Sequence, residues 1–186
     1  MFRCLALNWE KLGFPKSDES ILELGNKTKI TFDNEYVICD GRDVTKQIRT
    51  ESVSKNASKI SLFPSIRTAM KKQQRNIVKD VRISHKFHGA VLEGRDIGTE
   101  VFPNAQFKFY LDASPNIRAK RRMIQLQKKG KNVQYSQVLE NIKTRDFQDQ
   151  NREIAPLKPA KDAIILDTGV LKISQVIENL LSLLSK

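Results

Sequence analysis

Hydrophobic and polar residues follow different periods in different parts of the chain. At the start, the apolar positions recur at helical spacing, which predicts a helix ending near Gly13 and a second, short helix after a Ser17 cap. Between residues 27 and 54 the period shortens, and apolar runs at 29–32 and 36–39 flank a polar turn, which predicts a β-hairpin. A third short strand is expected at 43–48. The small and polar residues 52–61 are assigned no element.

Beyond residue 61, short apolar runs alternate with longer amphipathic stretches. The runs at 90–92, 107–111 and 163–167 contain β-branched and aromatic residues, which is typical of buried parallel strands. Helices are expected to begin at Pro64, at Ser114–Pro115, at Ser136 and at Ser174. The apolar stripe that should pack the last helix on the core consists of Val176, Ile177, Leu180, Leu181 and Leu184. The pattern therefore predicts an α/β fold with a small antiparallel insert.

A charged, glycine-containing loop at 93–103 joins two of the expected strands. Ligands of open α/β sheets bind beyond the carboxyl ends of the strands, which is where this loop is expected to lie. Gly94 and Gly98 bracket Arg95 and Asp96, so a guanidinium and a carboxylate could together hold an anion and a polar base. The alternative is an ordinary surface turn carrying a charge pair.

Composition limits the classes of protein to which the chain can belong. The chain has 186 residues, of which 39% are hydrophobic and 29% charged, as in soluble globular proteins. No apolar run approaches the ~18 residues of a membrane span, and the start lacks a signal-peptide layout, so we expect a cytoplasmic protein without a membrane partner. Cys4 and Cys39 lack metal-ligand spacing and are interpreted as reduced packing residues. The net charge of +12 indicates an acidic partner: a nucleotide, a nucleic acid or an anionic surface.

Two basic stretches are candidates for contact with that partner. Residues 118–122 contain four cations, which form either a solvated helix face or an RNA contact, although no aromatic residues are interleaved. Arg145 and Arg152 are seven positions apart and share a helix face with Asp149 between them. Such a face is explained either by surface ion pairing or by recognition of a phosphate and a ribose hydroxyl.

Several separated motifs resemble the bacterial cytidylate kinase family in order and spacing. They are the loop at 93–103, the helix at 114–130, the face at 145–152, Ala155-Pro156-Leu157, residues 56–58, residues 63–67 and Met1-Phe2-Arg3. The resemblance covers essentially the whole chain. It implies a P-loop nucleoside-monophosphate-kinase fold, with a parallel sheet, flanking helices and a basic lid. The implied divisions are core at 1–26, an inserted nucleotide-monophosphate subdomain at 27–61, core at 62–112, the lid region at 113–152 and core at 153–186.

The same resemblance implies phosphoryl transfer from ATP, with Mg²⁺, to CMP or dCMP, giving CDP or dCDP. It assigns cytosine recognition to Ser58, Arg67 and Asp96. It assigns the monophosphate to Arg3, Arg95 and Arg152. Arg145 and Asp149 would engage the ribose, and Arg145 could swing toward the transferring phosphoryl group, so Arg145 and Arg152 are the implied catalytic residues. Arg121 would contact ATP. A monomer with no specific nucleic-acid partner is expected.

The chain departs from the family pattern in three places. Glu93 stands where Asp is usual, and Gln148 and Gln150 occupy lid positions that are usually charged. The phosphate-loop signature Gly-x-x-x-x-Gly-Lys-Ser/Thr does not occur in the sequence. We therefore expect the family's first strand, phosphate loop and first helix to be missing, and phosphoryl transfer by this chain alone to be doubtful. The alternative function is a non-catalytic pyrimidine-nucleotide or RNA-binding protein.

Overall fold

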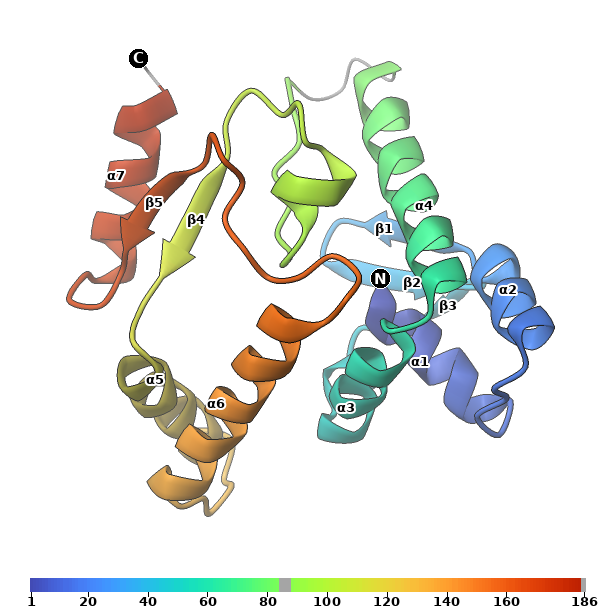
Figure 1. Cartoon of the computed structure of the whole chain (residues 1–186), viewed down its shortest axis with the longest axis horizontal. Coiled ribbons are helices and arrows are strands. Elements are labelled where there is room, and N and C mark those ends of the chain that lie inside the picture. The colour runs from blue at the N-terminus through green and yellow to red at the C-terminus, as the bar shows by residue number, and fades with distance from the viewer. Residues whose placement is uncertain (84–87, 185–186) are drawn as a thin grey trace. The chain divides into compact units, whose positions relative to one another are not determined.

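The computed structural model describes residues 1–83 and 88–184 (Figure 1). The chain divides into two compact units, Met1–Leu92 and Glu93–Lys186. Unit 1 contains α1 (Phe2–Lys11), α2 (Asp18–Lys27), β1 (Ile30–Asp33), β2 (Tyr36–Cys39), β3 (Arg42–Asp43), the 3₁₀-helix η1 (Gln47–Arg49), α3 (Glu51–Ile60) and α4 (Pro64–Ile83). Unit 2 contains the π-helix η2 (Ile97–Val101), β4 (Phe109–Asp112), α5 (Pro115–Gln127), α6 (Tyr135–Asn151), β5 (Ile164–Asp167) and α7 (Ile173–Leu184).

Unit 1 has a continuous apolar core between its helices. Helix α1 packs on α3, and α2 packs on α4. The largest side chains that are fully removed from water are Leu5, Ile21, Ile60, Ile66 and Met70. Both cysteines belong to this core as buried free thiols, which confirms the packing role expected for them.

Most local signals in unit 1 are confirmed. Helix α1 ends before Gly13, which adopts a φ of 73° that an L-residue rarely tolerates. The Ser17 side chain caps α2 by accepting a hydrogen bond from the Ser20 amide. The antiparallel hairpin pairs Ile30 with Cys39 and Asp33 with Tyr36. These elements follow the sequence because their signals are local.

Three expectations in unit 1 are wrong. Residues 52–61 lie almost entirely in helix α3, because Thr50 caps its first turn and Val53, Ala57 and Ile60 bury one face. The third strand is only the two residues of β3, and the chain then turns into η1. Residues 90–92 form no strand, and Val91 is fully exposed, because a strand needs a paired neighbour that the described residues do not provide here.

Unit 2 is built on the expected parallel pairing. Strands β4 and β5 pair in parallel, with Phe109 opposite Ile164 and Asp112 opposite Asp167. Ser114 caps α5 and Pro115 occupies its first turn, as the sequence predicts. Helices α5 and α6 lie side by side (Figure 1). The mixture of parallel strands and flanking helices agrees with the α/β class expected for a nucleoside-monophosphate-kinase fold.

The sequence predicts that the strands of unit 2 and the apolar face of its last helix are buried, and this prediction is wrong. Leu111 of β4 is 53% exposed and Ile165 of β5 is 62% exposed. Helix α7 has no buried residue, and Ile177, Leu181 and Leu184 of its apolar stripe are exposed. Periodicity correctly identified a helix with one apolar face, but it could not show whether another element covers that face.

Candidate functional site

Four charged side chains converge near the C-terminal end of α6, and we refer to them as the Asp149 cluster. Its members are Arg95, Arg145, Asp149 and Arg152. The Asp149 carboxylate forms an ion pair with Nη1 of Arg95, and it lies 3.8 Å from Nε of Arg145 and 3.5 Å from Nη1 of Arg152. One largely buried carboxylate therefore faces three guanidinium groups.

The end of α6 explains how three of these residues meet. Arg145 and Asp149 are one helical turn apart, so their side chains share a face. At Arg152 the backbone leaves the helix with φ −69° and ψ 142°. The chain then folds back, and the Leu157 amide donates to the Asp149 carbonyl at 2.7 Å. This fold-back returns the Arg152 side chain to the helix end, where Nε donates to the Ala155 carbonyl at 2.5 Å.

The fourth member, Arg95, comes from the predicted loop at 93–103. This loop is more ordered than expected, since residues 97–101 form the five-residue π-helix η2. The Asp96 carbonyl accepts the Glu100 amide at 2.9 Å at the start of that turn. A Cβ added to Gly94 would lie 2.7 Å from Cγ1 of Ile97, so this glycine is required for close packing. The loop is thereby fixed with Arg95 directed at Asp149.

Burial and mutual repulsion control the electrostatics of the cluster. Burial, together with repulsion from Arg145, lowers the pKa of Arg95 to about 10, so the side chain remains charged near neutral pH. Burial also lowers the pKa of Arg152, and the negative charge of Asp96 opposes that shift. Three guanidinium groups and one carboxylate leave two positive charges in the Asp149 cluster.

One atom of the cluster lacks a partner. Nη2 of Arg152 is buried and forms no hydrogen bond within the part of the chain that the structure describes. The Arg152 side chain is only 9% exposed. A buried cationic donor without an acceptor is costly, so this nitrogen indicates a place for an anionic ligand.

Three further acceptor-site candidates, Arg3, Ser58 and Arg67, belong to unit 1. Nη1 of Arg3 donates to the Ile48 carbonyl at 2.9 Å. Arg67 extends over the ring of Phe2, at 5.7 Å, and its Nη1 donates to the Ser61 carbonyl at 3.1 Å. The hydroxyl of Ser58 lies 3.4 Å from the Ser54 carbonyl. Ser58 and Arg67 therefore lie on either side of the turn between α3 and α4.

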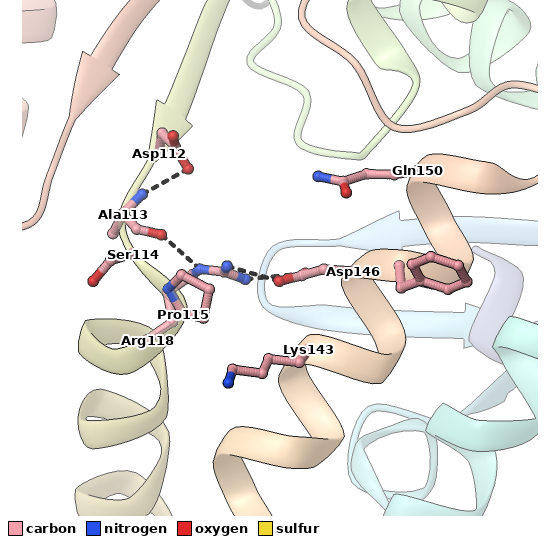
Figure 2. Close-up of a pocket in the computed structure, with 9 residues that line it drawn as sticks. Asp112, Ala113, Ser114, Pro115, Arg118, Lys143, Asp146 and Gln150 are labelled. Atoms are coloured by element: carbon pink, nitrogen blue, oxygen red, sulfur yellow. Dashed lines mark hydrogen bonds and ion pairs between the residues drawn. The ribbon is translucent and has the colours of Figure 1, made fainter.

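A second charged site, which the sequence reasoning missed, joins α5 to α6. Arg118 forms two hydrogen bonds to Asp146, at 3.0 and 2.7 Å, and its Nε donates to the Ala113 carbonyl at 2.8 Å. The ion pair borders a hollow of about 340 Å³ at the β4–α5 junction. Figure 2 shows Lys143 and Gln150 extending from α6 toward this junction. Arg118 and Asp146 are 28 positions apart, so no local sequence pattern predicts that they pair.

Arg121, the residue expected to contact ATP, is engaged within unit 2. Its Nη1 donates to the Thr168 hydroxyl at 3.1 Å, and its Nη2 donates to the Thr168 carbonyl. Weaker contacts reach the carbonyls of Gly169 and Leu171. The side chain thus connects α5 to the segment between β5 and α7.

The described ranges 1–83 and 88–184 contain no group of three or more His, Cys, Asp or Glu side chains arranged to hold a metal ion. No helix in these ranges has the length and apolar content that crossing a bilayer requires.

Comparison with known proteins shows which family the chain resembles. A family model described as cytidylate kinase matches residues 1–186. Cytidylate kinase 1 of Haemophilus influenzae is 46% identical over 150 residues, which are 81% of this chain and 62% of the relative. The cytidylate kinase of Pasteurella multocida is 47% identical over 146 residues, covering 78% of this chain and 61% of the relative. That of Actinobacillus succinogenes is 44% identical over 167 residues, covering 88% and 71%. The chain thus spans about three fifths of the first two relatives.

Proposed function

The chain belongs to the cytidylate kinase family, and from this premise we propose that it provides the acceptor site of a kinase that transfers a phosphoryl group from ATP to CMP or dCMP. The products would be CDP and dCDP. The chain would act as a monomer on free nucleotides, in the cytoplasm.

The observation that carries the proposal is the charge and geometry of the Asp149 cluster. Its two excess positive charges match the dianion of a nucleoside monophosphate, whose second pKa is about 6. The partnerless Nη2 of Arg152 provides a buried donor for one phosphate oxygen. Arg95 would contribute a second donor. The family resemblance also assigns Arg3 to the monophosphate. The Asp149 cluster therefore suits a phosphate better than it suits a neutral ligand.

Two members of the cluster are proposed to serve the ribose and the transferring group. The carboxylate of Asp149 can accept a hydrogen bond from a ribose hydroxyl while it remains close to Arg152. Arg145 is 49% exposed, so its guanidinium has room to turn from Asp149 toward a phosphoryl group in transfer. Phosphoryl transfer depends mainly on positioning the reactants and neutralising charge, and an arginine that contacts the transferring group contributes to both.

We assign recognition of the base to Asp96, Ser58 and Arg67. A carboxylate accepts a hydrogen bond from the exocyclic amine of cytosine, which uracil lacks, so Asp96 gives a physical reason for selecting cytosine. Asp96 also precedes η2, which fixes its backbone beside Arg95.

The donor side of the reaction is implied by the family. ATP would supply the phosphoryl group, and Mg²⁺ would neutralise charge on its phosphates. The described residues contain no metal-ligand cluster, and the sequence contains no phosphate-loop signature, so neither the metal nor the ATP phosphates are assigned to residues of this chain. Arg121 is the proposed contact to ATP, and it would have to exchange its bond to the Thr168 hydroxyl for one to the nucleotide.

Calorimetric titration of the 186-residue chain with CMP and with cytidine tests the acceptor site without requiring catalysis. We expect CMP to bind more tightly than cytidine and the preference to fall by about ten- to a hundredfold in Arg152→Gln, because a charge-assisted contact to the phosphate is lost. Lys172→Gln removes one exposed positive charge outside the cluster and serves as the matched control. An Arg152→Gln protein that keeps the full preference for CMP would refute the proposal. RNA binding that ignores CMP would favour the nucleic-acid alternative.

A further inference from the structure

Ala155 has an unusual backbone conformation. Within the described part of unit 2 it is the one residue other than glycine with a positive φ, at 50°. The left-handed region is disfavoured for alanine because its Cβ approaches the backbone. Pro156 follows it, and a residue before proline is further restricted. Strain of this kind persists only where the surrounding structure holds it in place, and it concentrates at functional sites.

The conformation is not needed to end helix α6. In the common left-handed helix stop, the glycine or asparagine follows the helix immediately and its amide bonds back to the last turn. Here the helix ends at Asn151 with Arg152 as its cap, and Ala155 lies three residues beyond that cap. The bond back to the helix comes from Leu157, whose amide donates to the Asp149 carbonyl at 2.7 Å. The left-handed residue therefore has another role.

That role is visible in the contacts of Arg152. Nε of Arg152 donates to the Ala155 carbonyl at 2.5 Å, while Nη1 lies 3.5 Å from Oδ1 of Asp149. A guanidinium group is planar and rigid, so holding Nε and Nη1 also fixes the direction of Nη2. Nη2 is the buried donor without a partner in the described structure.

We propose that Ala155 is a positioning residue for Arg152: its left-handed backbone turns the carbonyl onto Nε and thereby aims Nη2 at the phosphate of the bound nucleotide. The identity of that anion rests on the proposed function. The positioning of the guanidinium by the Ala155 carbonyl does not depend on it. Ala155 is itself buried, at 9% exposed.

Substitutions that differ in their tolerance of positive φ test the proposal. Glycine and asparagine enter the left-handed region readily, whereas a β-branched residue does not. Ala155→Gly and Ala155→Asn should keep the preference for CMP over cytidine. Ala155→Val should lose that preference by about tenfold or more while cytidine binding stays unchanged, because only the contact to the phosphate depends on Arg152. Ala155→Gly is the matched control. If it keeps the preference for CMP, the left-handed conformation positions Arg152 and the strain of alanine in that conformation is not required.

Nuclear magnetic resonance of the ligand-free chain gives a second measurement that does not depend on nucleotide binding. The side-chain Nε–H of Arg152, assigned by its loss in Arg152→Lys, should exchange slowly with solvent in the wild-type chain and in Ala155→Gly. It should exchange rapidly in Ala155→Val. The exposed Arg122 provides the fast-exchange reference, because its hydrogen bond to Gln125 uses Nη1 and not Nε.

The outcomes separate this inference from the proposed function. A wild-type chain that does not prefer CMP over cytidine, but shows a protected Arg152 Nε–H that Ala155→Val abolishes, would overturn the proposed function and support the positioning. If Ala155→Val retains both the CMP preference and the protected Nε–H, the positioning is refuted. A wild-type Nε–H that exchanges as fast as that of Arg122 refutes it as well, even if the valine variant does not fold.

Discussion

The guanidinium of Arg95 is paired with the carboxylate of Asp149, although 54 positions of sequence separate the two residues. The pair joins the loop before η2 to the end of α6, and it brings Arg95 beside Arg145 of α6 and Arg152 at the C-terminal cap of that helix. The acceptor site that we propose depends on this contact, because without it the three guanidinium groups would not share one carboxylate.

Asp149→Asn should destabilise the chain by about 1–3 kcal/mol, the usual effect of removing a charged hydrogen-bond partner from a largely buried site. The three guanidinium groups would then repel one another without compensation. Urea denaturation followed by circular dichroism measures the change. Glu23→Gln, which breaks an exposed pair with Lys27 on α2, is the matched control and should shift stability by less than about 1 kcal/mol. Equal midpoints for both variants would contradict the central role of Asp149.

Affinity for CMP should depend on pH in two ranges. In the acidic range the phosphate of CMP titrates, and in the alkaline range Arg95 of the protein titrates. Below about pH 6 the phosphate gains a proton and loses one of its two charges, so binding should weaken as pH falls. Between pH 7 and 9 the affinity should be constant, because the pKa of Arg95 is lowered only to about 10 and the guanidinium remains protonated. As pH rises through 10, Arg95 loses its charge and binding should weaken again. Calorimetric titration at fixed ionic strength measures the profile, and a steady decline between pH 7 and 9 would contradict it.

Asp96→Ala should reduce selectivity for CMP over UMP by about ten- to a hundredfold, the value of one buried charge-assisted contact. The loss should appear as weaker CMP binding, since uracil offers no amine to the carboxylate. Competition titrations with the two nucleotides measure the ratio. Lys172→Gln again supplies the control, and unchanged selectivity in Asp96→Ala would remove this residue from base recognition.

Lys108→Met should destabilise unit 2 by about 1–3 kcal/mol, because the nearly buried ammonium donates to the Pro103 carbonyl and to Asp162, and the carbonyl would lose its partner. Asp162→Asn should have a smaller effect, because Asp162 is exposed. Lys108 lowers the pKa of Asp162, so the ion pair stabilises the fold above about pH 4 and its contribution is lost as pH falls through the lowered value. Denaturation midpoints of both variants at pH 7 and pH 3 test this, and a larger loss in Asp162→Asn would contradict it.

The 186-residue chain assayed alone should bind CMP but turn it over far more slowly than the ~1–10³ per second of ordinary enzymes. Its sequence contains no Gly-x-x-x-x-Gly-Lys-Ser/Thr, whose backbone amides and lysine would hold the donor phosphates in line with the acceptor. A coupled assay of ADP release with CMP and Mg-ATP decides the point. Turnover in the ordinary range would show that other residues hold the ATP.

Local features of the fold can be predicted from the sequence where residues close together in the chain determine them. Ser114 and Pro115 start α5 because one caps the helix and the other has a φ already suited to its first turn. The hairpin at β1 and β2 follows from the polar turn between two apolar runs. No helix is predicted at residues 52–61, because most of their side chains are small and polar. The structure has a helix there, since Thr50 caps it and Val53 and Ile60 pack into the core.

The sequence by itself determined which charged residues share a face of α6, since the spacing of Arg145 and Asp149 and the periodicity of a helix are sufficient for that. It also determined the family, through motifs whose order can be read along the chain. Only the tertiary structure decided that Arg95 meets Asp149, that Arg118 meets Asp146, and that the apolar stripe of α7 is exposed. These features depend on contacts between distant segments, and on a left-handed Ala155 that directs Arg152, so no local pattern of residues encodes them.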